Sequence, residues 1–195
     1  NKAIISLNFT LDENPSLKTT LAFSLLGQML FDNPASPVVQ NLNKAGFNNI
    51  SSMYFTNAIQ PYISVVAQNT NEDMKNLFEE IVYSSLKDIV DKGIDKTLIK
   101  STLNSVELDQ RQQFSRGATT GLLYGELAML SWLYDGNPLN MIDIDGALSE
   151  LKVALEEPYF ENLIEKYILK NNHSSIVVIK PKKGLMEERN KAVVE

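Results

Sequence analysis

The residues that could carry chemistry are few in this sequence, and the first of them is a single histidine, His173. Cysteine is absent, which excludes disulfides, thiolate metal sites and cysteine nucleophiles. Zinc motifs built on a pair of histidines are excluded as well. His173 follows Asn172 at the entry to a β-branched run, where a hydrogen-bonded structural imidazole is the expected role and a functional one the alternative. We therefore expect no catalytic residue and no metal ligand in this chain.

Carboxylates and glycines give two further patterns. The segment from Asp143 to Gly146 resembles the start of a calcium loop, but its glycine comes too early and Ala154 stands where a bidentate Glu is needed. Helix capping by Asp143 is the expected interpretation. The glycines at 117, 121 and 125 lie within a helical pattern, and no Gly-Lys-Ser/Thr follows a strand, so a phosphate-binding loop is excluded.

Composition limits the class of protein. With 195 residues, 44% of them apolar, we expect one domain with its own core. A net charge of −6 argues against nucleic acid and anionic membrane as partners, because both require a basic face. The first residues alternate like a strand and do not resemble a signal peptide, and the first residue is not Met. We expect a piece of a longer polypeptide, cytoplasmic unless targeting information lies outside it.

The first third of the chain predicts a strand, two helices and a hairpin. Residues 3–11 alternate with a period of two, which is typical of a half-buried strand. Ser16 and Ser36 are expected to cap the two helices, the first of which closes at Asn33-Pro34. Two β-rich runs follow, at 50–56 and 59–68. The first run is polar for its length, which favours a position at the edge of a sheet.

The remainder predicts helices and one last strand. A helix capped by Asn71 or Thr70 is expected to end at Gly93. Further helices are expected from Asp95 to Gln113, at 146–156 and at 158–170, followed by a strand at 173–180. The first has an apolar stripe comprising Met74, Leu77, Phe78, Ile81, Leu86, Ile89 and Val90. Glu107 and Arg111 are expected to form an ion pair. The fold class is therefore α+β, a small and mostly antiparallel sheet with helices packed on one face.

A helix in residues 114–138 carries three glycines spaced four apart, Gly117, Gly121 and Gly125. Glycine in a helix interior costs roughly 1 kcal/mol relative to alanine, so a close neighbour is expected against that backbone. We predict a buried central helix that crosses another element. A membrane dimer motif is rejected because Arg116, Glu126 and Asp135 interrupt the apolar run.

Seven segments in a fixed order carry a resemblance to a known family. They are SLKTTLAFSLLGQMLFDNPASPVVQNL, GID at 93–95, VELDQR ending at Arg111, FSRGATTGLL, LSWLYDGNP, YFENLIEKYILKNNH and VVIKP. Together they span nearly the whole chain, although no single one is diagnostic. The series resembles the second, non-catalytic domain of the N-terminal half in pitrilysin-type (insulinase-like) zinc metallopeptidases, specifically the presequence-protease (falcilysin-like) branch.

The resemblance implies a place in a larger zinc endopeptidase that degrades peptides. Enzymes of this family have four related α/β domains in two bowl-like halves, joined by a helical hairpin around a peptide chamber. Their first domain carries an inverted HxxEH zinc motif, whereas the corresponding helix here reads LAFSLLGQMLFDN. Zinc is thus implied for the parent enzyme and not for this chain. Residues 1–181 would be the domain and residues 182–195 the start of the linker, with the other domains of the parent chain as partners.

The same resemblance implies a substrate-binding role for one strand. In related enzymes an edge strand after the second helix pairs with peptide substrate by strand addition. The corresponding residues here are Asn49, Ile50, Ser51, Ser52, Met53 and Tyr54. Three alternatives stay open: an edge covered by a neighbouring domain, an inactive peptide-binding or scaffold domain of the same fold, and an unrelated enzyme that uses carboxylates. We expect the chain alone to hydrolyse no peptide.

Overall fold

The computed structural model describes all residues except 1, 57, 114–118, 186–188 and 191–195. The described residues form one antiparallel sheet in the order β2-β3-β1-β4. Its strands are β1 (Ala3–Thr10), β2 (Asn49–Phe55), β3 (Tyr62–Thr70) and β4 (Ser174–Ile179). The prediction that the first polar β run is an edge strand is confirmed, since β2 pairs with β3 alone.

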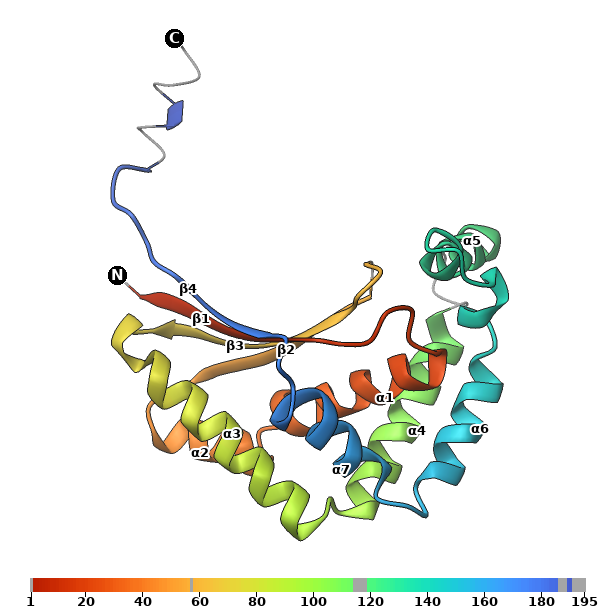
Figure 1. Cartoon of the computed structure of the whole chain (residues 1–195), viewed down its shortest axis with the longest axis horizontal. Coiled ribbons are helices and arrows are strands. Elements are labelled where there is room, and N and C mark those ends of the chain that lie inside the picture. The colour runs from red at the N-terminus through yellow and green to blue at the C-terminus, as the bar shows by residue number, and fades with distance from the viewer. Residues whose placement is uncertain (1, 57, 114–118, 186–188, 191–195) are drawn as a thin grey trace.

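The helices lie on one side of this sheet, except α5, which stands apart beyond the end of the sheet (Figure 1). They are α1 (Leu17–Gly27), α2 (Pro37–Lys44), α3 (Lys75–Lys92), α4 (Lys96–Gln113), α5 (Thr120–Trp132), α6 (Ile144–Ala154) and α7 (Tyr159–Ile164). Short helical turns extend or join them: η1 (Gln28–Asp32), η2 (Glu72–Met74), η3 (Pro138–Met141) and η4 (Glu165–Leu169). The predicted fold class, an α+β domain with an antiparallel sheet and helices on one face, is confirmed.

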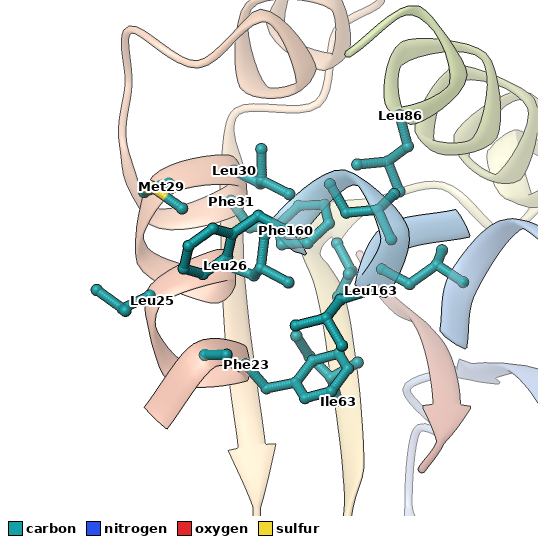
Figure 2. Close-up of a cluster of buried hydrophobic side chains, with 14 of the residues drawn as sticks. Phe23, Leu25, Leu26, Met29, Leu30, Phe31, Ile63, Leu86, Phe160 and Leu163 are labelled. Atoms are coloured by element: carbon teal, nitrogen blue, oxygen red, sulfur yellow. The ribbon is translucent and has the colours of Figure 1, made fainter. Parts of the chain in front are cut away.

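The core lies between the sheet and the helices. Alternate β1 residues, among them Ile5, Leu7 and Phe9, are buried, as a strand with one covered face requires. Figure 2 shows Phe23 of α1 and Phe160 of α7 directed into the same cluster of apolar side chains. This continuous cluster gives the chain a core of its own.

The predicted helix caps are confirmed at three positions. Ser16 Oγ accepts a hydrogen bond from the Thr19 N–H at 3.2 Å, and Ser36 Oγ accepts one from the Val38 N–H at 3.3 Å. Asp143 accepts one from the Gly146 N–H at 2.9 Å, so this segment is a helix start and not a calcium loop. Each cap satisfies a backbone donor that the first helical turn leaves without a partner.

Three local predictions were wrong. Leu77 is exposed, because the buried side of α3 passes through Phe78, Val82 and Leu86 instead. Asn71 makes no side-chain cap, because the short turn η2 precedes α3. The second β run begins at Tyr62 and not at residue 59, since Pro61 has no N–H to give to the sheet.

The glycine-rich helix was predicted to be buried, and this was also wrong. Gly117 lies outside the described residues, but a Cβ atom added at Gly121 or Gly125 would meet nothing within 4 Å. Figure 1 shows α5 set apart from the other helices. The glycine spacing predicted a neighbour against this backbone, and none of the described residues lies there. The glycine stripe faces away from this domain.

The domain boundary at 181/182 stays a prediction, because much of the tail lies outside the described residues. Within the part of the chain that the structure describes, no helix has the length and apolarity needed to cross a lipid bilayer.

Candidate functional site

The predicted peptide-binding residues, 49–54, all lie in β2 at the edge of the sheet. In an antiparallel pair each residue directs its N–H and C=O groups to the same side, and successive residues alternate. The Thr10 N–H donates to the His173 C=O at 3.1 Å, so Thr10 directs its backbone groups toward β4. By alternation, Phe9 directs its groups toward β3 and bonds its partner Ile63. The same alternation along β3 then decides which β3 residues face β2. Asn49, Ser51 and Met53 then bond β3, while Ile50, Ser52 and Tyr54 direct their backbone groups outward.

A contact from another element agrees with this assignment. The Ser52 N–H donates to Asp32 Oδ1 at 2.7 Å, so it points away from β3. The Ser52 hydroxyl donates to Asp32 Oδ2 at 2.8 Å. No hydrogen bond from the described residues reaches the outward N–H groups of Ile50 and Tyr54. At this edge the outward backbone groups of Ile50 and Tyr54 are therefore open, and Ser52 between them is bonded to Asp32.

Asp32 is a site residue that the sequence reasoning missed. It is the last residue of η1, a π-helical turn that continues α1. The turn after it is fixed because Ser36 Oγ donates to the Leu30 C=O at 2.6 Å and Asn33 Oδ1 accepts from the Ala35 N–H at 2.9 Å. No local pattern could have marked Asp32, since its partner is twenty residues away in sequence.

The side chains of β2 divide between the two faces of the sheet. Ile50 and Tyr54 pack against the core, and the Tyr54 ring lies 6.0 Å from that of Phe23. Met53 and Phe55 are exposed on the opposite face, where Phe55 stacks on Tyr62 at 4.6 Å. Burial raises the pKa of Tyr54 to about 12, so its phenol stays protonated at neutral pH. Tyr54 thus anchors the strand and performs no acid-base chemistry near neutrality.

Gly27, at the end of α1, allows the close approach of helix and strand at Ser52. A Cβ atom at this position would lie 2.6 Å from Ser52 Oγ, the atom that bonds Asp32. An alanine would therefore force the hydroxyl off the carboxylate, which offsets the helix-propensity gain of about 1 kcal/mol.

We predict a coupling of about 1 kcal/mol between positions 27 and 52. Gly27→Ala should be more favourable by that amount in a Ser52→Ala background than in the wild type, because no hydroxyl is left to displace. Urea unfolding of the four proteins in the double-mutant cycle measures this coupling. Additive effects would show that the contact does not constrain the strand.

The donor set for zinc does not fit this chain. On α1, where the resemblance would place a metal motif, the inward side chains include Leu21, Leu25 and Leu26, which are buried and apolar. Across the described ranges, no group of three or more His, Cys, Asp or Glu side chains could hold a metal ion. At the start of β4 the His173 backbone N–H donates to Asn171 Oδ1 at 2.7 Å, and the role of the His173 imidazole stays a prediction.

A second polar cluster joins the end of β1 to η4. Asp12 accepts hydrogen bonds from Lys166, at 2.8 Å, and from the Tyr167 hydroxyl. The Lys166 ammonium first, and the Tyr167 hydroxyl next, hold the pKa of the Asp12 carboxyl below its ordinary value. Because the side chains of this cluster bond one another, we assign it a structural role: it links the end of β1 to η4.

The cluster of Asp12, Lys166 and Tyr167 predicts a pH-dependent contribution to stability. A carboxyl with a lowered pKa stabilises the fold above its unfolded pKa of about 3.9, and the contribution disappears as pH falls through the folded pKa. Asp12→Asn should therefore be less stable than the wild type at pH 7, with a difference that shrinks toward pH 3. Denaturant unfolding at both pH values measures this, and an unchanged difference would contradict it.

The exposed side of α5 forms an apolar surface that we call the α5 face: Gly121, Leu122, Gly125, Met129, Trp132 and Leu133. These residues recur three or four apart and border a hollow of about 790 Å³. Leu122, Trp132 and Leu133 are each more than 60% exposed, at 62%, 63% and 64%. Exposed apolar side chains gathered on one helix are typical of surfaces where a protein or domain docks.

Comparison with known proteins gives relatives over nearly the whole chain. The chain is 36% identical over 191 residues to Protein HypA of Clostridium perfringens, which covers 97% of this chain and 20% of that protein. It is 27% identical over 196 residues to the chloroplastic/mitochondrial presequence protease 1 of Arabidopsis thaliana, covering 96% and 18%. The chain thus spans about a fifth of the length of these relatives. No family model matches.

Solved structures share the fold. The inactive peptidase domain of a proposed zinc protease from Bordetella parapertussis superposes with a TM-score of 0.74 at 11% identity, covering 95% of this chain and 96% of that one. That solved chain therefore consists almost entirely of this fold. A peptidase M16 inactive domain from Pseudomonas fluorescens gives 0.59 at 12% identity, covering 93% and 41%. The cytoplasmic location stays a prediction.

Proposed function

We propose that this chain forms a non-catalytic wall of a peptide chamber. The chain belongs to the pitrilysin-type (insulinase-like) zinc metallopeptidases and resembles their presequence-protease branch. In this role the chain holds extended peptide on the edge of β2 while zinc and the bond-breaking residues belong to another domain of the parent enzyme. Residues 1–181 form the wall and residues 182–195 begin the linker.

The observation that carries the proposal is the outward set of backbone groups on β2. The N–H and C=O groups of Ile50 and Tyr54 lack partners among the described residues. The two residues are four positions apart, which at about 3.4 Å per residue of strand is about 14 Å. An extended peptide supplies complementary groups at the same spacing. Backbone pairing selects an extended shape and not a particular side chain, which suits an enzyme that degrades peptides of many sequences.

The α5 face supports the second half of the proposal, a parent enzyme with further domains. Relatives about five times longer than this chain have the additional polypeptide that could cover such a surface. The glycines at 121 and 125 leave the helix backbone open to a helix at close range. We assign the α5 face to packing against another domain of the same parent chain.

Peptides with N-methyl groups test the strand addition without any change to the protein. An eight-residue peptide methylated at alternate nitrogens loses the N–H groups of one edge only. Methylation of the nitrogens that face β2 should weaken binding at least tenfold, because their N–H groups are removed. Methylation of the alternate nitrogens, which face away from β2, should change the affinity little. Isothermal titration calorimetry gives both affinities. An equal loss of affinity for the two methylated peptides would contradict strand addition.

A further inference from the structure

We propose that Asp32 guards the edge of β2, so that an incoming strand pairs fully only after the Asp32 carboxylate leaves Ser52. This inference rests on the proposed function, because it concerns the same edge. It adds a regulatory residue that lies outside the strand and that no local sequence pattern marks.

The first argument is the position of the contact. Ser52 is the middle one of the three outward residues, between Ile50 and Tyr54. Its N–H already donates to Asp32 Oδ1 at 2.7 Å and its hydroxyl to Oδ2 at 2.8 Å, so both carboxylate oxygens are used. A peptide can bond the edge at either end, but at the centre it finds the donor occupied.

The second argument is electrostatic. A strand that pairs with Ser52 must bring one of its own carbonyl oxygens to the Ser52 N–H. That oxygen would arrive beside the Asp32 carboxylate, and two acceptors repel each other. Charged side chains directed at an edge are a known means by which proteins prevent unwanted strand pairing.

The third argument is that the guard can move. Asp32 is exposed, so its carboxylate can turn into water and recover hydrogen bonds there. The backbone behind it is held by the bonds of Ser36 to Leu30 and of Ala35 to Asn33. Opening the edge therefore needs a change in one side chain and leaves the helix and the strand in place.

The test compares the affinity of an unmethylated eight-residue peptide for the wild type, Asp32→Ala and Asp32→Asn. Asp32→Ala should bind about tenfold more tightly, because no contact has to be broken before the peptide pairs with Ser52. Asp32→Asn should lie between the two, since an amide oxygen still accepts a bond but carries no charge. The matched control is Asp91→Asn, an exposed residue of α3, which removes the same charge and should leave the affinity unchanged.

Circular dichroism and urea unfolding establish that each variant is folded, and NMR hydrogen exchange of the Ser52 amide provides an independent readout. This amide should be protected in the free wild type and exchange faster in Asp32→Ala. If the wild type binds peptide and Asp32→Ala binds equally or more weakly, the guard is overturned while the proposed function stands. If no folded variant binds the peptide, both are overturned.

Discussion

Replacing Phe23 by alanine is expected to lower the free energy of unfolding by about 3–5 kcal/mol. The Phe23 side chain is fully buried and belongs to the cluster of apolar side chains in Figure 2. Its ring is 5.2 Å from that of Tyr167 and 6.0 Å from that of Tyr54, so it connects α1 with η4 and with the edge strand. Truncation removes apolar contacts and leaves a cavity that the surrounding elements cannot fill.

Urea unfolding followed by circular dichroism measures this loss. Leu122→Ala is the matched control, because it also truncates a large apolar residue on a helix, but one that is 62% exposed. The control should change the free energy of unfolding by no more than about 0.5 kcal/mol. Similar losses in the two variants would contradict the role of Phe23 in the core.

Removing the two large side chains at the end of the α5 face is expected to weaken its docking by 2 kcal/mol or more, about thirtyfold. The change is Trp132→Ser with Leu133→Ser, and the expected binding partner is the remainder of the parent enzyme produced as a separate polypeptide. Since both side chains are exposed in this chain, its own stability should change little.

Analytical ultracentrifugation of the mixed polypeptides gives the affinity. Val153→Ser on α6 is the control, because this residue is 73% exposed and lies outside the α5 face. It should leave the affinity unchanged. An unaltered affinity in the Trp132 and Leu133 variant would show that another surface holds the domains together.

Features set by short-range physical chemistry were predicted well from the sequence. The alternation in β1 and the serine caps at Ser16 and Ser36 depend on neighbours within a few residues, and each is confirmed. The ion pair of Glu107 with Arg111, at 3.0 Å, is confirmed for the same reason, since helix geometry alone brings these residues together. The polar composition of β2 was sufficient to place it at an edge.

Features that depend on distant partners could not be predicted. The π-helical turn that carries Asp32 to the edge has no sequence signal, and the contact with Ser52 exists only once helix and strand are packed together. The position of α5 illustrates the same limit. The spacing of Gly121 and Gly125 predicted a close neighbour, but a Cβ atom added at either position would meet nothing within 4 Å.

Amide hydrogen exchange in the presence of an extended peptide tests the central claim most directly. The sheet has a second edge, β4, which serves as an internal control within the same sample. The account predicts that saturating peptide slows exchange at the Ile50 and Tyr54 amides of β2 and leaves the outward amides of β4 unchanged. Slowed exchange at β4, or at neither edge, would contradict it.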